Sequence, residues 1–535
     1  MACGSAAQRS NGDGAQIVSI NTWGADDANS WIPGAFPGYG DATLFDASFN
    51  PKPAYMAVLT TLQTGANAVP VAPQYVSGAE VLPQLAFGGG WYSALYFTNF
   101  RGSAVSTSIS FTSDAGTPLD IPSAGGSLVQ ENLPPYGTAI IEAPNSGGLV
   151  EGDARFTLPP GVFGYGVFRQ SVPGIADQEA VVPFSSSGAT SSMLTWDETV
   201  STTAVAIVNP SAAAATVAVK LWDSGGNAIG TTTIQLAPNT KTEAVLHSLP
   251  GLSGMVGKLG SAQFTASSGD VAVLGLRFRG AAFTSIPTTA AAAASAQSEV
   301  LPQFAFGGGW YSALYFTNFS ETATSFPVNF IGDSGAPLTV PSVGGSISQV
   351  NLPPYGTATI EAPNSGSLVE GYATFTLPPG VFGYGVFRQS VAGIADQEAV
   401  VPFSSSGATS SALTWDEMVS TTAVAIVNPS STAATVVITV WDADGNTIGT
   451  ASVPLAPNAK TEAVLRSLAG LSGMAGQRGS AQFTVLSGDV AVLGLRFRGS
   501  AFTSIPTTNP GPPDLPVNPG DIPFSRALSD RRARP

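Results

Sequence analysis

A long internal duplication constrains the fold of this chain more than any other feature. The run EVLPQLAFGGGWYSALYFTNF begins at Glu80, and the nearly identical run EVLPQFAFGGGWYSALYFTNF begins at Glu299. The same spacing separates RFRG at Arg277 from RFRG at Arg496, so no insertion distinguishes the copies. The two copies span residues 80–288 and 299–507. A fold that satisfies the first copy therefore has to satisfy the second as well.

Each copy contains a weaker duplication at a shorter spacing. Asn99 is followed at one fixed spacing by Asn209, and Phe168 is followed at that same spacing by Phe278, each phenylalanine preceding an arginine. Other matched positions lie slightly closer together, because loops differ in length while the strand pattern is kept. The chain therefore carries four related modules of about 100 to 110 residues, near the size of one β-sandwich.

The pattern inside a module predicts strands. STSISFTS, ATVAVKLWD and DVAVLGLRF alternate small or polar residues with large apolar ones at period two, and no helical period competes. Between these runs lie DSGGN, DADGN and LPPYG, which are turn sequences of antiparallel sheets. We expect a mainly all-β protein with four tandem antiparallel β-sandwiches (Ig-like) in two duplicated pairs, preceded by a short α/β segment.

The expected domains follow from these repeats and from shifts in composition. The spacer TTAAAAASAQS and the Pro-rich tail are too small or too polar to form a core. We divide the chain into an unstructured or non-native start (1–16), an α/β segment (17–66), a linker (67–79), sandwich 1 (80–187), sandwich 2 (188–287), an Ala/Ser linker (288–298), sandwich 3 (299–406), sandwich 4 (407–507) and the tail (508–535).

Composition excludes several classes of partner. Only 10% of the residues are charged and the formal net charge is −15, which repels nucleic acid and anionic membranes. The single cysteine, Cys3, excludes an intrachain disulfide and a thiolate metal cluster. The first sixteen residues lack the pattern of a secretory signal, and no apolar run reaches eighteen residues. We expect no cofactor, no metal and a monomeric chain.

Acidic pairs are the candidates for chemistry within the sandwiches. On a strand, the D-x-E of ADQEA would place both carboxylates on one face, a geometry that acid/base catalysis can use. The alternative is that these groups are solvated or pair with Arg169 and Arg388. The pairs in ADQEA are Asp177/Glu179 and Asp396/Glu398, and the candidate catalytic residues from TWDE are Asp197, Glu198, Asp416 and Glu417.

Comparison of the two copies argues against two other kinds of site. His247, the only histidine, is replaced by Arg466 in the second copy, so we expect a surface residue near a turn. DADGN at Asp442 resembles a calcium loop only faintly, since its counterpart DSGGN at Asp223 has one carboxylate fewer. We predict a hairpin turn at both places and no metal.

The aromatic run GGGWYSALYF suggests a binding surface. Alternation along a strand directs Trp91, Ser93 and Leu95 to one side and the intervening residues to the other, so that one set is core and the other exposed. Exposed aromatic rings next to glycines can stack on sugars, whereas buried ones only fill the core. The candidate glycan-binding residues are Trp91, Tyr92, Trp310 and Tyr311.

Residues 17–62 contain three motifs of a different character. The apolar strand IVSINTWG leads into the loop motif WGADDANSW, which is followed by LFD and then by PKPAY in a helix with proline near its first turn. This stretch resembles the last βα unit of glycoside hydrolase family 10, the endo-β-1,4-xylanases. The resemblance implies that Trp23 and Trp31 line the glycone side of a xylan cleft, although both could instead fill a barrel mouth.

The same resemblance implies that catalysis needs more than this stretch. Retaining hydrolysis in that family uses two glutamates, one as acid/base and one as nucleophile, on earlier barrel strands than the one resembled here. Because one βα unit cannot close an eight-stranded barrel, we expect residues 17–62 to lack a stable fold and an active cleft. We expect the chain to be the truncated end of a longer gene product.

These observations lead to one functional prediction and two alternatives. The sandwiches resemble repeated, mostly uncharacterised β-sandwich segments behind catalytic domains of secreted bacterial proteins. We predict the C-terminal part of a modular, secreted xylan-degrading glycoside hydrolase, whose accessory sandwiches bind or space plant polysaccharide such as xylan. The alternatives are an extracellular structural or adhesive stalk without a glycan site, and a hydrolase that uses sandwich carboxylates.

Overall fold

The computed structural model describes residues 78–290, 295–485 and 488–510. In these residues nearly all regular structure is β-strand, arranged as four antiparallel sandwiches, which confirms the predicted fold class for this part of the chain. The α/β segment expected at 17–66, with Trp23 and Trp31, lies outside the described residues.

Sandwiches 1 and 3 have the same nine-strand topology. The larger sheets have the strand orders β4-β3-β6-β1-β9 and β21-β20-β23-β18-β26, and the smaller ones β5-β2-β7-β8 and β22-β19-β24-β25. Sandwich 1 comprises β1 (Gly78–Phe87), β2 (Trp91–Asn99), β3 (Val105–Ser113), β4 (Leu128–Leu133), β5 (Thr138–Ala143), β6 (Val150–Leu158), β7 (Val162–Gln170), β8 (Gln178–Pro183) and β9 (Ser185–Ser186). Sandwich 3 comprises β18 (Gln297–Phe306), β19 (Trp310–Asn318), β20 (Thr324–Gly332), β21 (Ile347–Leu352), β22 (Thr357–Ala362), β23 (Val369–Leu377), β24 (Val381–Gln389), β25 (Gln397–Pro402) and β26 (Ser404–Ser405).

Sandwiches 2 and 4 share an eight-strand topology. Their sheets have the orders β10-β15-β12-β13 with β14-β11-β16-β17, and β27-β32-β29-β30 with β31-β28-β33-β34. Sandwich 2 comprises β10 (Ser191–Asp197), β11 (Thr202–Val208), β12 (Ala215–Asp223), β13 (Ala228–Leu236), β14 (Lys241–Val245), β15 (Leu259–Ser268), β16 (Ala272–Arg279) and β17 (Ala282–Ile286). Sandwich 4 comprises β27 (Ser410–Asp416), β28 (Thr421–Val427), β29 (Ala434–Asp442), β30 (Thr447–Leu455), β31 (Lys460–Val464), β32 (Arg478–Val485), β33 (Ala491–Arg498) and β34 (Ala501–Ile505).

Helical structure in the described residues is limited to single 3₁₀ turns. None of these helices is long or apolar enough to cross a membrane. They are η2 (Pro122–Ala124), η3 (Leu246–Ser248), η4 (Ser253–Met255), η5 (Leu465–Ser467) and η6 (Ser472–Met474).

Strand burial follows the period of two that the sequence predicted, except where sandwiches meet. On β3, Thr107, Ile109 and Phe111 are buried in the sandwich core while Ser106 and Ser108 are exposed. An outer strand therefore has one solvent-exposed face and one buried face.

The strand β2 behaves differently, because it is buried on both faces from its second residue onward. Leu95 and Phe97 belong to the core of sandwich 1, whereas Tyr92 and Tyr96 pack into a cluster with residues of sandwich 4. The face that sequence alternation left open to solvent is covered by another sandwich.

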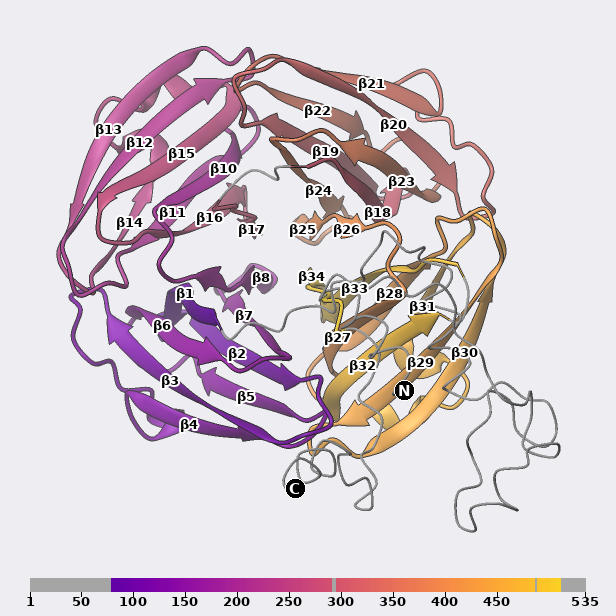
Figure 1. The fold of residues 1–535 in the computed structure, drawn as a ribbon, viewed down its shortest axis with the longest axis horizontal. Helices are drawn as coiled ribbons and strands as arrows, with labels where there is room; N and C mark the ends of the chain where they lie inside the picture. Colours follow the sequence, from indigo (N-terminus) through magenta and orange to yellow (C-terminus); the bar gives the residue numbers. More distant parts are fainter. Residues whose placement is uncertain (1–77, 291–294, 486–487, 511–535) are drawn as a thin grey trace, which may run out of the picture. The chain divides into compact units, whose positions relative to one another are not determined.

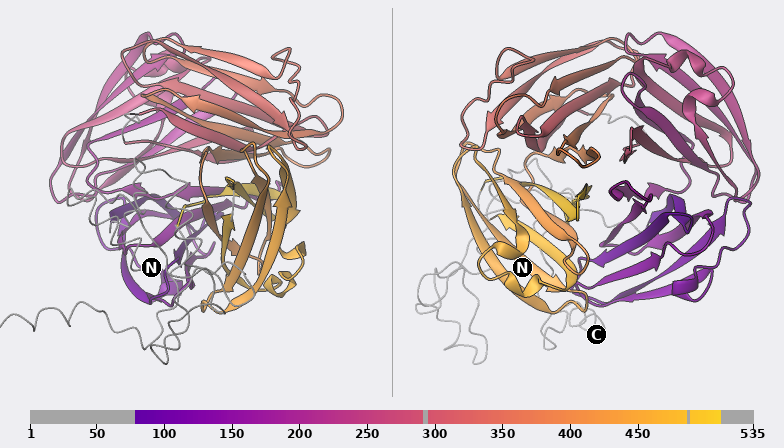
Figure 2. Two further views of the ribbon diagram at one scale, coloured as in Figure 1. Left: turned by 45° about the vertical axis from the view of Figure 1, so that its right-hand side comes forward. Right: turned by 180° about the vertical axis from the view of Figure 1, so that it is seen from behind.

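Apolar residues shared between neighbours join the four sandwiches in a closed ring (Figures 1 and 2). Phe283 of sandwich 2 packs in the core of sandwich 1, and Tyr315 of sandwich 3 packs in that of sandwich 2. Phe502 of sandwich 4 packs in the core of sandwich 3, and Tyr96 of sandwich 1 packs in that of sandwich 4. Each sandwich therefore contacts two neighbours.

The ring has two kinds of junction. The first half of the ring is residues 78–290 (sandwiches 1 and 2), and the second half is residues 295–510 (sandwiches 3 and 4). A pair junction joins the two sandwiches within a half. A half junction joins one half to the other, between sandwiches 2 and 3 and again between sandwiches 4 and 1.

Four edge strands, β8, β17, β25 and β34, meet at the centre of the ring (Figure 1). They are joined by hydroxyl groups rather than by a backbone ladder. The N–H of Val181 on β8 donates to Thr503 Oγ1 at 3.1 Å, and the Val181 carbonyl accepts from Ser285 Oγ at 2.6 Å. Val400 on β25 has the equivalent bonds to Thr284 and Ser504. The centre is thus held by polar contacts of defined register.

Candidate functional site

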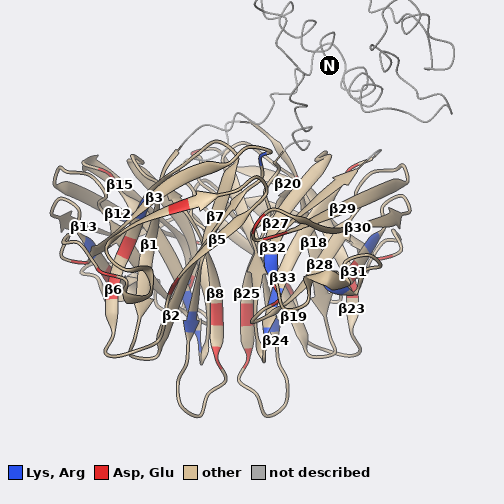
Figure 3. Ribbon diagram, turned by 90° about the horizontal axis from the view of Figure 1, so that it is seen from below, with Lys and Arg blue, Asp and Glu red and all other residues tan. Residues whose placement is uncertain are grey.

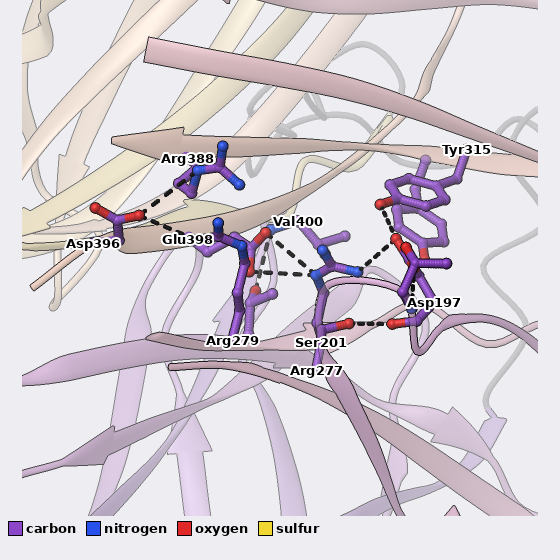
Figure 4. Close-up of polar contacts among 12 residues, drawn as sticks. Asp197, Ser201, Arg277, Arg279, Tyr315, Arg388, Asp396, Glu398 and Val400 are labelled. Carbon is purple, nitrogen blue, oxygen red and sulfur yellow. Dashed lines mark hydrogen bonds and ion pairs between the residues drawn. The ribbon is translucent and has the colours of Figure 1, made fainter. Parts of the chain in front are cut away.

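A buried charge network lies at the half junction between sandwiches 2 and 3 (Figure 4). Strand β16 places Arg277 there with a side chain only 3% exposed. Its Nε lies 3.3 Å from each carboxylate oxygen of Glu398 on β25, and its Nη1 lies 3.4 Å from Asp197 Oδ2 at the end of β10. The Tyr315 hydroxyl donates to the same Asp197 oxygen at 2.7 Å. The arginine of one half therefore bridges carboxylates from both halves.

The other half junction, between sandwiches 4 and 1, repeats this network. Arg496 Nε lies 3.0 Å from Glu179 Oε2, and Arg496 Nη1 lies 3.9 Å from Asp416 Oδ2. Tyr96 donates to Asp416 Oδ2 at 2.9 Å. The carboxylates of ADQEA and TWDE form separate pairs in the sequence, but one from each motif, Glu179 and Asp416, meet at this half junction.

Asp197 and Arg277 in this network are held in their charged forms, and Tyr315 is held in its neutral form. Burial raises the pKa of Asp197, but hydrogen bonds from Thr199, the charge of Arg277 and the hydroxyl of Tyr315 outweigh it, so the pKa lies below its ordinary value. Burial lowers the pKa of Arg277, but the negative charge of Glu398 and its other neighbours raises it above the ordinary value. Burial raises the pKa of Tyr315 well above that of a free tyrosine, which keeps its hydroxyl a donor.

This geometry suits cohesion rather than acid/base catalysis. A glycosidase acid must carry a proton near neutral pH and must reach the sugar. Asp197 is 4% exposed and ionised, and Glu398 is 1% exposed. Glu179 and Glu398 are thus buried rather than solvated, and each pairs with an arginine across a half junction. Asp197 and Asp416, two of the predicted catalytic candidates, lie in these networks.

Glu198 and Glu417, the other two candidates, bond to the strands that follow them, β11 and β28. Glu198 Oε1 accepts the backbone N–H of Thr203 at 2.7 Å, and its Oε2 lies 2.9 Å from His247 Nδ1. Glu417 makes the same contacts with Thr422 and with Arg466. His247 and its replacement Arg466 therefore occupy one position with one role, a polar partner for the same glutamate.

A second layer of charge lies at the rim of each half junction. Arg279 Nη1 is 3.1 Å from Asp396 Oδ2, and Arg388 Nε is 3.8 Å from the same oxygen. Arg498, Asp177 and Arg169 repeat the arrangement at 3.1 and 3.8 Å. Asp177 and Asp396 thus pair with Arg169 and Arg388, as one reading of the sequence held, and each also bonds an arginine from another sandwich.

Two equivalent hollows lie beside these rim pairs. Their volumes are about 500 and 450 Å³. Loops that precede β8 and β25 extend from the same end of the ring (Figure 3). Val200 and Val419, 47% and 44% exposed, add an apolar surface to a polar lining. One hollow is lined by Asp177, Val419, Arg498, Gly499 and Ser500, and the other by Val200, Arg279, Gly280, Ala281, Ala395 and Asp396.

The aromatic residues predicted to bind glycans lie against neighbouring sandwiches. Trp91 packs edge-on against Phe283 of sandwich 2, with ring centroids 5.5 Å apart. Tyr92 is 9% exposed, its hydroxyl donates to Glu142 at 2.6 Å, and the Arg169 guanidinium covers its ring at 4.0 Å.

Trp310 and Tyr311 have the equivalent surroundings in the second half. Trp310 packs against Phe502, and Arg388 covers the ring of Tyr311. The placement of all four rings favours the alternative in which they fill the core.

The turns DSGGN and DADGN are hairpins that interlock with the opposite half. In the latter, Asp442 Oδ1 accepts the backbone N–H of Asn446 at 2.8 Å, which holds the turn. The Ala443 carbonyl accepts the N–H of Thr138 at 2.9 Å, and Trp441 stacks on Tyr136 with centroids 4.7 Å apart. Trp222 stacks on Tyr355 in the same way at the other half junction.

One group of carboxylates has the proximity that a metal site requires. Oxygens of Asp333, Glu370 and Glu462 lie within 4.8 Å of one another. The buried ammonium of Lys460 forms ion pairs with Asp333 at 3.1 Å and with Glu462, and it donates to Gln303. The lysine supplies the positive charge that this cluster needs, at the pair junction between sandwiches 3 and 4.

Comparison with known proteins bears on the start of the chain. Residues 6–61 match the model of glycosyl hydrolase family 10. This confirms the resemblance predicted from the WGADDANSW, LFD and PKPAY motifs. The matched segment lies outside the described residues.

The relatives matched by this segment are xylanases. The segment is 55% identical over 49 residues to endo-1,4-beta-xylanase 2 of Aureobasidium pullulans and 49% identical over 55 residues to endo-1,4-beta-xylanase 5 of Pyricularia oryzae. It is 48% identical over 46 residues to endo-1,4-beta-xylanase B of Thermotoga neapolitana.

The similarity is local in both directions. The aligned residues are 9% or 10% of this chain, and the chain spans 13% or 14% of the length of these relatives. Two of the three relatives are fungal, and the bacterial origin expected from the sandwiches stays a prediction.

The arginines that organise the site could have been found in the sequence. Arg277 and Arg496 occur in RFRG, which repeats between the copies. The signal was a buried strand in which an arginine alternates with leucine and phenylalanine. A buried arginine needs a carboxylate partner, and ADQEA contained it.

Proposed function

We propose that this chain is part of a xylan-degrading system, in which a xylanase-like segment is followed by a non-catalytic ring of sandwiches that attaches to plant polysaccharide. The observation that carries the proposal is the match of residues 6–61 to glycosyl hydrolase family 10, with xylanases among the relatives. An extracellular location and xylan as the partner follow from the same match.

The non-catalytic role of the ring is supported by the pairing of its carboxylates. Arg277 and Arg496 hold the buried carboxylates of both networks, and Asp197 keeps its charge. A hydrolase that used Asp197 or Asp416 would have to break these contacts before it could bind a sugar. One that used Glu198 or Glu417 would have to break the contacts of those glutamates with the strand that follows and with His247 or Arg466. Attachment to polysaccharide needs only groups on the surface of the ring.

The two rim hollows are the places where we expect polysaccharide to bind. Each offers guanidinium donors and a carboxylate acceptor for sugar hydroxyls, with a valine for the C–H face of a ring. Because two equivalent hollows belong to one chain, a long polysaccharide that engages both gains affinity from the raised effective concentration.

A second candidate is a structural or adhesive role without a glycan site. The packing of Trp91, Tyr92, Trp310 and Tyr311 against other side chains favours it, since exposed aromatic rings are the usual platform for sugars. In this case the ring would serve as a rigid body behind the xylanase-like segment.

Retention on insoluble xylan tests the proposal with the full chain. We expect the chain to be retained, dissolved xylan to release it, and Arg279→Ala/Arg498→Ala to weaken retention by more than about tenfold, since each lost hydrogen bond to a charged group costs about 1.5–3 kcal/mol. The pair Lys220→Ala/Arg478→Ala, outside the hollows, is the control. A chain that passes through the xylan column would rule out attachment and favour the structural role.

Release of reducing sugar from xylan separates attachment from hydrolysis. We expect none from the purified chain. Release that survives purification and is lost in Glu198→Gln/Glu417→Gln would overturn the non-catalytic role of the ring.

A further inference from the structure

The two half junctions use the same side chains. Each contact at one junction has its counterpart at the other, at the spacing that separates the two copies in the sequence. The matched residues are Asp197 and Asp416, Arg277 and Arg496, Tyr315 and Tyr96, Glu398 and Glu179, Thr195 and Thr414, Thr317 and Thr98, Trp222 and Trp441, and Tyr355 and Tyr136.

One contact of the pair junctions has changed between the halves, whereas the matched contacts of the half junctions have not. In the first half, Arg155 Nη2 donates to the Asn239 carbonyl at 2.9 Å. In the second half, Thr374 stands at the position of Arg155, and the Asn458 carbonyl is instead bonded by Tyr372 at 2.8 Å. Identity across the half junctions is therefore not a mere consequence of the duplication.

Each half carries both sides of the half junction. The second sandwich of a half supplies the arginine, the aspartate and the interlocking hairpin, as Arg277 does for the first half. The first sandwich supplies the glutamate, the tyrosine and the loop that receives the hairpin, as Glu179 does for the same half. A half is consequently complementary to a copy of itself.

We propose that the half junction is a self-association surface whose partner is the equivalent half of a second copy of this chain. Two first halves can close a ring through two half junctions related by a true two-fold axis, with the contacts seen here. The intact chain can therefore exchange halves with a second chain, so that each ring contains halves from both. The sequence between the halves, residues 288–298, consists of Thr, Ala, Ser and Gln. It contains no charged residue that would oppose such exchange.

A cleavable full-length chain tests the proposal. A protease recognition sequence replaces Ala290–Ala294, and the folded ring is cleaved once. Native mass spectrometry should find the two fragments still associated. The fragments are then unfolded, mixed and refolded, and the pairs counted. Interchangeable halves should give first–first, first–second and second–second pairs in a ratio of about 1:2:1.

One charge reversal makes the outcome specific. Arg496→Glu damages only the second half, so a first–first pair keeps two intact junctions, a first–second pair keeps one and a second–second pair keeps none. We expect first–first pairs to become the main species. Adding Glu179→Arg should restore the first–second pair, because it re-creates an opposite charge at the damaged junction.

The proposal fails if refolding returns first–second pairs alone, or if the fragments separate after cleavage. It also fails if Arg496→Glu leaves the ratio of the three pairs unchanged, which would mean that the halves associate without the arginine network. Circular dichroism of the separated fragments distinguishes loss of association from loss of folding.

Discussion

Arg277 and Glu398 lie 121 residues apart in the chain and 3.3 Å apart in space, and neither is more than 3% exposed. They belong to different sandwiches of different halves. The ion pair therefore stabilises the closed ring and not the fold of either sandwich alone.

Replacing Arg277 with methionine should destabilise the ring by about 3–5 kcal/mol, because Glu398 and Asp197 would stay buried without their counter-charge. Unfolding in urea measures the change. Arg279→Met is the matched control on the same strand, and its partly exposed ion pair should contribute less than about 1 kcal/mol. Equal losses from the two variants would contradict the role assigned to burial.

Removing the hydroxyl of Tyr315 should make the ring more sensitive to acid. The folded pKa of Asp197 lies below its unfolded value near 3.8, so this group stabilises the protein above that pH, and the stabilisation is lost as pH falls through the folded pKa. Tyr315→Phe removes a donor, raises the folded pKa and moves this loss to higher pH. Thermal unfolding between pH 2 and 6 checks it, with Tyr355→Phe, whose hydroxyl is exposed, as the control.

Ionisation of Glu299 should lower the stability of the folded protein as pH rises. Burial raises its folded pKa to about 7, from an ordinary value of 4.5. A raised carboxyl pKa means that folding favours the protonated form, so stability falls as pH rises from about 4.5 through 7. Glu299→Gln should raise the Tm at pH 8 and leave it unchanged at pH 4, whereas Asp120→Asn, at an exposed position, should change neither. A variant with a lower Tm at pH 8 would contradict this.

Gly445 should be irreplaceable for the ring and not only for its turn. It has φ +81°, and a Cβ there would lie 1.8 Å from the Pro135 carbonyl oxygen of sandwich 1. Gly476 has φ +71° with nothing within 4 Å of an added Cβ. Both alanine variants carry the strain of a left-handed residue, about 1 kcal/mol, but only Gly445→Ala has to separate two sandwiches. Urea unfolding should show a clearly larger loss for Gly445→Ala, and similar losses would argue against interlocking.

Period and spacing predicted the local fold of the described residues well. Strands such as β3 and β12 follow the alternation of STSISFTS and ATVAVKLWD, because one face of each contacts a core and the other contacts water. The turns DSGGN and DADGN are the predicted hairpins.

The ring itself was beyond the reach of those patterns. Alternation in WYSALYF assigns one face to the core and one to solvent, yet Tyr92 and Tyr96 contact a sandwich from the far end of the chain. A contact at that separation leaves no local periodicity. The contact was indicated by residue chemistry instead. Arg277 in an apolar strand required a buried acid, and Glu398 in ADQEA was one of the few acids available.

The hydroxyl contacts of Val181 and Val400 have a consequence for behaviour at high concentration. An unpaired strand edge is the usual template on which one β-protein recruits another into aggregates. At β8 and β25 the backbone groups of these valines are occupied by Thr503, Ser285, Thr284 and Ser504. In the closed ring these central sheet edges are therefore covered. Opening the ring should expose them to strand pairing between molecules and lead to fibrils.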